Sequence, residues 1–172
     1  MALWKDGQFI ANEWRLVPKG VPLPHGVKAI VRLDRWKAER AVLSQRAEPL
    51  GLLLAPDSDW TEIIADLSRF AVIAVSFPKF ADGRAFSIAR LLRERDGYDG
   101  EIRAIGDYFI DQVPFMKRVG IDAFETDDPV LKNALGNGEW PEVAHYLQPG
   151  VTGAAEVPAG TRPWARRTAD PQ

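Results

Sequence analysis

The feature of the sequence that most constrains the fold is a repeated alternation of short apolar runs and helical patterns. Two of these runs are apolar almost throughout, LGLLLA and VIAVSF, which is typical of strands covered on both faces of a sheet. Between them an apolar helical face is built from Trp60, Ile63, Ile64, Leu67 and Phe70. Strands joined by helices of this length must run parallel, because each helix returns the chain to the same end of the sheet.

The alternation predicts an α/β fold with a parallel sheet of about five βα units. The expected strands cover residues 27–31, 50–55, 72–77, 101–106 and 121–125. The expected helices cover residues 35–46, 59–70, 83–95 and about 112–119, with two short helices at 129–135 and 141–147. The sheet is either open or curved like part of a TIM barrel. Because five units cannot close an eight-stranded barrel, a curved sheet would leave an apolar edge, which makes a homodimer a hypothesis.

Segments of different composition flank these units. In residues 1–26 we expect an N-terminal hairpin and a linker, since Asp6-Gly7 tolerates the positive φ of a tight turn and residues 17–26 are rich in Pro and Gly. Trp4 and Trp14 would anchor the hairpin. The α/β domain then spans residues 27–148. Residues 149–172, with many Pro and Gly and few aliphatic residues, predict a flexible tail, whose basic cluster RPWARR either docks on a partner or stays solvated.

The composition excludes several kinds of chemistry. The chain has no cysteine, which excludes disulfides, thiolate nucleophiles and cysteine-ligated clusters or zinc. The two histidines, His25 and His145, are too far apart in sequence for a local metal motif, so we expect structural or exposed roles for them and no metal or cofactor. Neither a GxGxxG nor a Walker A pattern is present, which argues against the usual nucleotide sites.

Charge and hydropathy narrow the choice of partners. The formal net charge of -2 favours binding to neither nucleic acid nor an anionic membrane. No apolar run approaches the roughly 20 residues of a membrane-spanning helix, and the first residues, MALWKDGQFI, do not read as a signal peptide. We therefore expect a cytoplasmic protein.

Candidate binding residues follow the expected strands. In parallel α/β sheets, ligands bind beyond the C-terminal ends of the strands, where helix N-termini converge and attract anions. The loop after the third expected strand and the helix start behind it supply the candidates Lys79, Asp82, Gly83, Arg84 and Ser87. The next loop adds Asp107, Asp111 and Gln112, and the one after it adds Glu125, Asp127 and Asp128.

Each of these candidates also has a structural interpretation. Asp82 and Asp111 are suited to cap the helices that follow them, with Gly83 as a flexible entry residue and Gln112 as the first helical residue. Arg84 either contacts a ligand or pairs with Asp107 or Asp111. Arg103 lies inside a strand, so it either pairs with a carboxylate or faces the interior of a barrel-like sheet.

One stretch of the chain resembles a known family. Residues 77–93 read FPKFADGRAFSIARLLR, and Arg103-Ala104, Gly106-Asp107 and Asp111-Gln112 follow. This pattern resembles the bacterial family called domain of unknown function 934, over about residues 27–147. Members of the family are commonly labelled probable oxidoreductases involved in sulfite reduction.

The resemblance implies a pathway more than a reaction. Sulfite reduction needs electrons delivered through clusters or haem-type cofactors, and this chain has no cysteine ligands for a cluster. The implied role is an accessory protein of assimilatory sulfite reduction that binds sulfite reductase, its electron donor or a small anion at the C-terminal rim. The alternative is a small metabolic enzyme in which Lys79 and Arg84 hold an anionic substrate and Asp107 or Asp111 acts as acid or base. A structural subunit without a ligand is a third interpretation.

Overall fold

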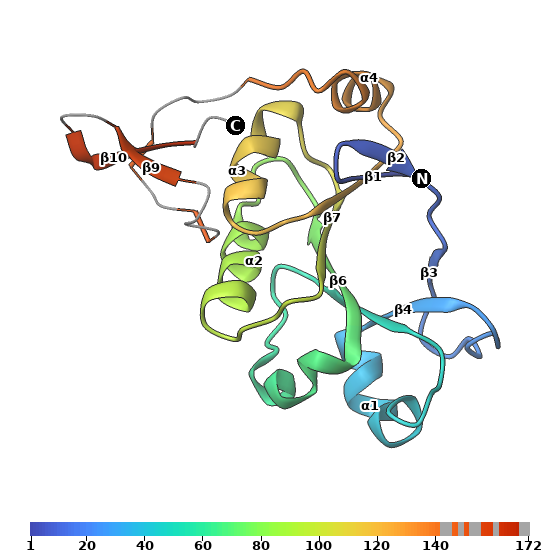
Figure 1. The fold of residues 1–172 in the computed structure, drawn as a ribbon. Helices are drawn as coiled ribbons and strands as arrows, with labels where there is room; N and C mark the ends of the chain where they lie inside the picture. Colours follow the sequence, from blue (N-terminus) through green and yellow to red (C-terminus); the bar gives the residue numbers. More distant parts are fainter. Residues whose placement is uncertain (142–145, 148–149, 152–155, 160–161, 169–172) are drawn as a thin grey trace.

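The computed structural model describes residues 1–141, 146–147, 150–151, 156–159 and 162–168. Its centre is a mixed sheet of eight strands in the order β2-β1-β8-β7-β6-β5-β4-β3 (Figure 1). The strands are β1 (Ala2–Lys5), β2 (Gln8–Ile10), β3 (Trp14–Leu16), β4 (Lys28–Arg32), β5 (Leu50–Leu54), β6 (Phe70–Phe77), β7 (Glu101–Gly106) and β8 (Ala123–Thr126). Neighbours from β3 to β8 pair in parallel, whereas β1 is antiparallel to both β2 and β8.

The prediction of a purely parallel sheet of five units is therefore not confirmed. Strands lie at all five expected positions, as β4 to β8, but three further strands belong to the same sheet. The N-terminal hairpin supplies two of them, because β1 pairs along its whole length with β8 and becomes part of the sheet. The third is β3, which pairs with β4. The fold class remains α/β, with a mixed sheet.

The hairpin turns at the predicted residues, Asp6 and Gly7, but it ends before Trp14. Asp6 and Gly7 have φ of 50° and 84°, the left-handed conformations of a tight hairpin turn. The second strand ends at Ile10, and Trp14 begins β3 on the opposite edge of the sheet. Trp4 is buried against Phe124, as expected of an anchor, while Trp14 packs on the other face of the sheet.

The connection from β2 to β3 shows that the sheet is strongly curled. Seven strand spacings of about 4.8 Å separate the two edges, or about 34 Å along the sheet. Four residue steps, from Ile10 to Trp14, reach at most about 14 Å. The edges must therefore approach each other, and the sheet forms a half-barrel whose open side is crossed by residues 11–13, at the right of Figure 1. We call residues 11–13 the strap.

The helices lie outside the curve. They are α1 (Leu33–Leu43), α2 (Arg84–Glu94), α3 (Val113–Arg118) and α4 (Pro129–Asn137), together with the 3-10 segments η1 (Thr61–Arg69) and η2 (Ile110–Gln112). Their apolar faces pack on the outward side chains of the strands, as Ile88 and Leu92 do with Phe77 and Ile102 in the main core. Inside the curve, a smaller apolar cluster is formed by Ile30, Leu53 and Ala74 with Trp14 and Ile105.

The segment expected as an α-helix at residues 59–70 is the 3-10 segment η1. Ile63 and Leu67 are buried as the apolar spacing predicts, whereas Ile64 of the same predicted face is 40% exposed. Asp59 and Glu62 do not form a capping box, because Asp59 accepts hydrogen bonds from Thr61 and Glu62 pairs with Lys37. In contrast, Asp128 caps α4, accepting a hydrogen bond from the backbone N–H of Val130 at 2.7 Å, and Pro129 follows it in the first turn.

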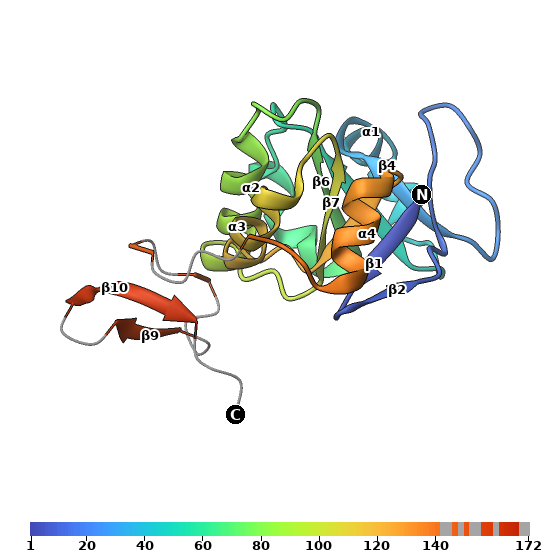
Figure 2. The same ribbon diagram turned by 90° about the horizontal axis from the view of Figure 1, so that it is seen from above.

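The described part of the tail forms a separate two-stranded antiparallel sheet, β9 (Glu156–Ala159) and β10 (Arg162–Thr168). Figure 2 shows this pair of strands apart from the eight-stranded sheet. These two strands lie in the segment predicted to be a flexible tail. The short helix expected at residues 141–147, including His145, falls largely on residues outside those described.

Candidate functional site

Two loops meet at the C-terminal end of the parallel strands. Residues 78–83 follow β6 and residues 107–112 follow β7, and β6 and β7 run parallel, so the loops leave the sheet at the same end. They are tied together by the N–H of Asp107, which donates to the Phe77 carbonyl at 2.7 Å, and by Gln112 Nε2, which donates to the Phe80 carbonyl at 3.3 Å. We call this end of the sheet the rim. The candidates Arg84 and Asp107, distant in sequence, both lie on it.

Asp82 and Arg84 form an ion pair within their own loop. The Asp82 carboxylate accepts hydrogen bonds from Arg84 Nε at 2.9 Å and Nη2 at 2.7 Å, and also from the Arg84 backbone N–H. The Arg84 side-chain hydrogen bonds lower the pKa of Asp82. The alternative in which Arg84 pairs with Asp107 or Asp111 is not what forms. The reason is proximity. Pairing with a carboxylate two residues away orders less of the chain, and so loses less conformational entropy, than pairing with one on another loop.

This ion pair makes the N-terminus of α2 less suited to binding an anion. Gly83, with φ of -82°, occupies the cap position and makes no side-chain cap bond, while Asp82 reaches past it to Arg84. A protein carboxylate therefore already lies beside the backbone N–H groups that would otherwise attract an anion. The other candidates on this loop, Lys79 and Ser87, are exposed, and their side chains make no hydrogen bond or ion pair with other described residues.

In the neighbouring loop, Gln112 has a bracing role. Its Oε1 accepts a hydrogen bond from the Phe109 N–H at 3.0 Å while its Nε2 binds the other loop. Gln112 is also the residue that precedes α3, so the expected cap at Asp111 is one residue too early. The side chains of Asp107 and Asp111 are exposed and have no hydrogen-bond partner within the described part of the chain.

An exposed pair of aromatic rings spans the two loops. The centroids of Phe80 and Phe109 are 4.7 Å apart, and the residues are 44% and 47% exposed. Exposed phenylalanines on two braced loops present an apolar contact surface that water does not favour. The sequence analysis did not single out these residues as site residues; their signal was the presence of one phenylalanine in each rim loop.

A cleft of about 260 Å³ also opens on the rim, over the ends of β4 and β5. Leu33 and Leu53 contribute apolar walls, and the charged residues around it include Arg32, Asp34 and Asp57. None of the residues that line this cleft was among the predicted candidates, although the cleft also lies at the C-terminal ends of parallel strands. Its carboxylates and cations are mixed, so its charge favours neither an anion nor a cation.

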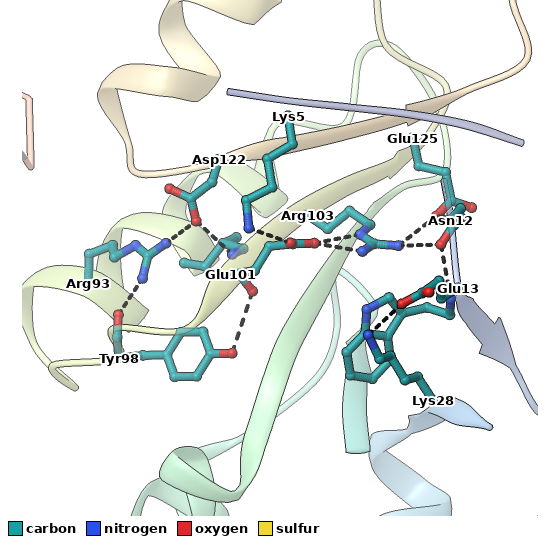
Figure 3. A network of polar contacts seen from close by, with 12 residues as sticks. Lys5, Asn12, Glu13, Lys28, Arg93, Tyr98, Glu101, Arg103, Asp122 and Glu125 are labelled. Atoms are coloured by element: carbon teal, nitrogen blue, oxygen red, sulfur yellow. Dashed lines mark hydrogen bonds and ion pairs between the residues drawn. The ribbon is translucent and has the colours of Figure 1, made fainter. Parts of the chain in front are cut away.

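Arg103 lies away from the rim, inside the curve of the sheet (Figure 3). Only 1% of the residue is exposed, and Glu101 accepts hydrogen bonds from its Nε at 2.8 Å and its Nη2 at 2.7 Å. Its Nη1 donates to Glu125 at 3.2 Å and to Asn12 in the strap at 3.1 Å. The expectation that Arg103 pairs with a carboxylate is confirmed, and its position removes it from the candidate rim site.

Lys5 completes this interior network from β1, the strand between β2 and β8. Its Nζ donates to Glu101 Oε2 at 2.8 Å, and this hydrogen bond raises the pKa of Lys5. Two cations and two carboxylates thus neutralise each other inside the curve, together with the apolar cluster around Ile30. The described interior of the curve therefore holds a charge-balanced network beside an apolar cluster.

A wider cleft of about 540 Å³ lies at the opposite, N-terminal end of β7 and β8. It is lined by Arg93, Tyr98 and Asp122 among others, and Arg93 donates to Asp122 and to the carbonyls of Gly100 and Gly120. These contacts join α2 to the loops before β7 and β8 and satisfy the polar groups internally. Among the described residues, no group of three or more His, Asp or Glu side chains is arranged to hold a metal ion.

No helix in the described part of the chain has both the length and the apolar character needed to cross a membrane. A family model described as bacterial protein of unknown function (DUF934) matches residues 51–155. No curated protein gives a significant match. No solved structure does either.

Proposed function

This chain belongs to the bacterial DUF934 family, and we propose that it is an accessory protein of assimilatory sulfite reduction that docks a partner protein at its rim. The partner is sulfite reductase or its electron donor. The pathway is implied by the resemblance of residues 77–112 to proteins labelled for sulfite reduction, and the lack of cysteine ligands favours an accessory over a catalytic role.

The observation that carries the docking proposal is the exposed Phe80–Phe109 pair. Aromatic residues are enriched at the centres of protein interfaces, where they bury a large area at a small cost in side-chain entropy. These two rings lie on loops that Gln112 braces, so the surface is held in shape before a partner arrives. Lys79, Asp107 and Asp111 add exposed charges around the rings, as expected of the polar edge of an interface.

The rim is less suited to a small anion than the sequence analysis expected. Asp82 places a negative charge at the start of α2 and binds Arg84, the principal candidate cation. An incoming anion would have to displace Asp82, whose low pKa keeps it ionised at neutral pH. A protein partner has no such competitor at the aromatic pair.

A small-molecule site remains the second candidate function, and the cleft over β4 and β5 favours it. The cleft lies where ligands bind in parallel α/β folds. Thermal shift of the purified chain with sulfite, sulfate and phosphate tests it. A shift that disappears in both Arg84→Ala and Arg32→Ala would support an anionic ligand at the rim, whereas no shift with any of the three would argue against one.

The docking proposal is tested by affinity capture with the full-length chain as bait in sulfate-grown cells of the host bacterium. Wild type is compared with Phe80→Ala/Phe109→Ala and with a control, Leu16→Ala/Val42→Ala, which removes two exposed apolar side chains of β3 and α1 (52% and 74% exposed). We expect wild type and the control to capture sulfite reductase or its electron donor and the rim variant to lose it. Failure of wild type to capture either protein, or equal capture by all three, would overturn the proposal.

A further inference from the structure

The C-terminal sheet is a basic arm whose two strands, among the described strands, pair only with each other. Residues 156–168 contain Arg162, Arg166 and Arg167 against one acidic residue, Glu156. A two-stranded sheet is at best marginally stable alone in water, so its order requires a surface to pack on. We call residues 156–168 the arm.

The rim carries the opposite charge on its β7 side. Residues 106–112 contain two acidic residues and no lysine or arginine, whereas the carboxylates at and after the end of β8, Glu125, Asp127 and Asp128, are engaged within the chain. Asp107 and Asp111 lie exposed in the first of these segments, beside Phe109 and Phe80. Guanidinium groups stack favourably on aromatic rings and pair with carboxylates, so this part of the rim suits an arginine-rich segment.

The arm leaves its own chain at the far end of the sheet. The Val151 N–H donates to the Arg118 carbonyl at 2.9 Å, and the Val151 side chain lies beside Gly120. Both contacts are at the end of α3 that precedes β8, whereas Asp107 and Asp111 lie at the opposite ends of the strands. The geometry therefore favours the rim of another molecule over the rim of the same one.

We infer that the arm of one chain docks on the Asp107–Asp111 side of the rim of a second copy, and that the second copy returns the contact. Reciprocal exchange of an identical element closes a symmetric dimer, without the open chain that one-sided docking would produce. The occupant is a second copy because this chain itself supplies both complementary charges. The inference stands without the role in sulfite reduction, but it uses the same surface, so the dimer and the partner compete.

Charge-reversal variants test this inference. The measurement is the molecular mass of each protein in solution, by sedimentation equilibrium at micromolar concentration. The arm variant is Arg166→Glu/Arg167→Glu, the rim variant is Asp107→Arg/Asp111→Arg, and the matched control is Arg15→Glu/Glu139→Arg, at two exposed positions elsewhere. We expect wild type and the control to be dimers in low salt and to dissociate in about 0.5 M salt, where screening is strong. Each of the two variants alone should be a monomer.

Mixing the two variants is the decisive measurement. In the mixture, the reversed arm of one meets the reversed rim of the other, and the two native surfaces also meet, so a dimer should reappear. A mixture that stays monomeric, or a monomeric wild type in low salt, would overturn the inference. Circular dichroism of each variant checks that folding is intact. If the arm variant dimerises as wild type does, the arm is not the contact and the inference is wrong.

Affinity capture separates this inference from the proposed function. A monomeric arm variant should capture at least as much sulfite-reduction partner as wild type, because its rim is free. A dimer confirmed by mixing, without capture of any such partner, would leave the self-association standing and remove the proposed function.

Discussion

Arg103 Nη1 donates to Asn12 Oδ1 across 3.1 Å, and the two residues are 91 positions apart in the sequence. This bond joins a central strand to the strap that crosses the open side of the curled sheet. Asn12 Nδ2 also donates to Glu125 at 3.0 Å, and the Trp14 N–H donates to Asn12 Oδ1 at 3.2 Å. Asn12 thus holds the strap to two neighbouring strands and positions Trp14 at the start of β3.

Replacing Arg103 should destabilise the protein more than replacing Asn12. Arg103→Met leaves Glu101 and Glu125 as poorly solvated carboxylates, so we expect a loss of about 3–5 kcal/mol in the free energy of unfolding. Asn12→Ala should cost about 1–3 kcal/mol through the unmet hydrogen bonds. Urea unfolding of both and of the double variant measures their coupling, and strict additivity would contradict a shared network. Glu13→Ala, in the same strap but in an exposed ion pair with Lys28, is the control and should change little.

The strands that could be predicted from the sequence are those formed by a continuous run of apolar residues. Residues 50–54 form a fully buried strand, and such a run has few alternatives in an α/β chain. Strand β3 has three residues and owes its place to pairing with β4 and to the strap, neither of which leaves a local pattern. The same holds for the pairing of β1 with β8, whose partners are more than a hundred residues apart.

In the candidate site, the end of the sheet on which residues lie could be predicted, but the contacts of their side chains could not. The rule about strand ends correctly places Arg84 and Asp107 at one end of the sheet, because it depends only on parallel pairing. Which partner Arg84 selects depends on distances that the rule does not contain, and the neighbour Asp82 prevails over Asp107. The Phe80–Phe109 contact was missed because exposure of an aromatic residue cannot be derived from its type.

The backbone conformation at Gly106, at the rim end of β7, requires a glycine. Its φ is +105°, and a Cβ at this position would overlap the Phe77 carbonyl oxygen. We expect Gly106→Ala to lower the free energy of unfolding by at least about 2 kcal/mol, from the strained φ and the overlap together. Chemical denaturation measures this. Gly83→Ala is the control, because its φ is -82° and the added Cβ would meet only Phe86 at 3.6 Å, so it should stay within about 1 kcal/mol of wild type. Equal losses in both would contradict this account.

The Asp128 cap should contribute measurably to stability. Its Oδ1 accepts from the N–H groups of Val130 and Leu131, which have no partner within α4. Asp128→Ala should therefore lower the free energy of unfolding by about 0.5–2 kcal/mol. Its neighbour Asp127, in exposed contacts of 3.7 and 4.0 Å, gives the matched variant Asp127→Ala, for which we expect a smaller effect. Thermal unfolding of the two variants measures both effects. A larger loss of stability in Asp127→Ala than in Asp128→Ala would refute the assignment of the cap.

Asp96 should make stability depend on pH in the acid range. Its side chain is 2% exposed, and the hydrogen bond from Arg95 lowers its pKa below the ordinary 3.8, with a further hydrogen bond from Trp60 Nε1 at 2.8 Å. Because the folded pKa is the lower one, its stabilisation is fully present above pH 3.8 and is lost as the pH falls through the folded value. The difference in unfolding free energy between wild type and Asp96→Asn should thus be constant near neutral pH and shrink below pH 3.8. Asp99→Asn, at an exposed site three residues away, controls for loss of a charge alone. A difference for Asp96→Asn that grows on acidification would mean that the Arg95 and Trp60 contacts do not favour the ionised carboxylate.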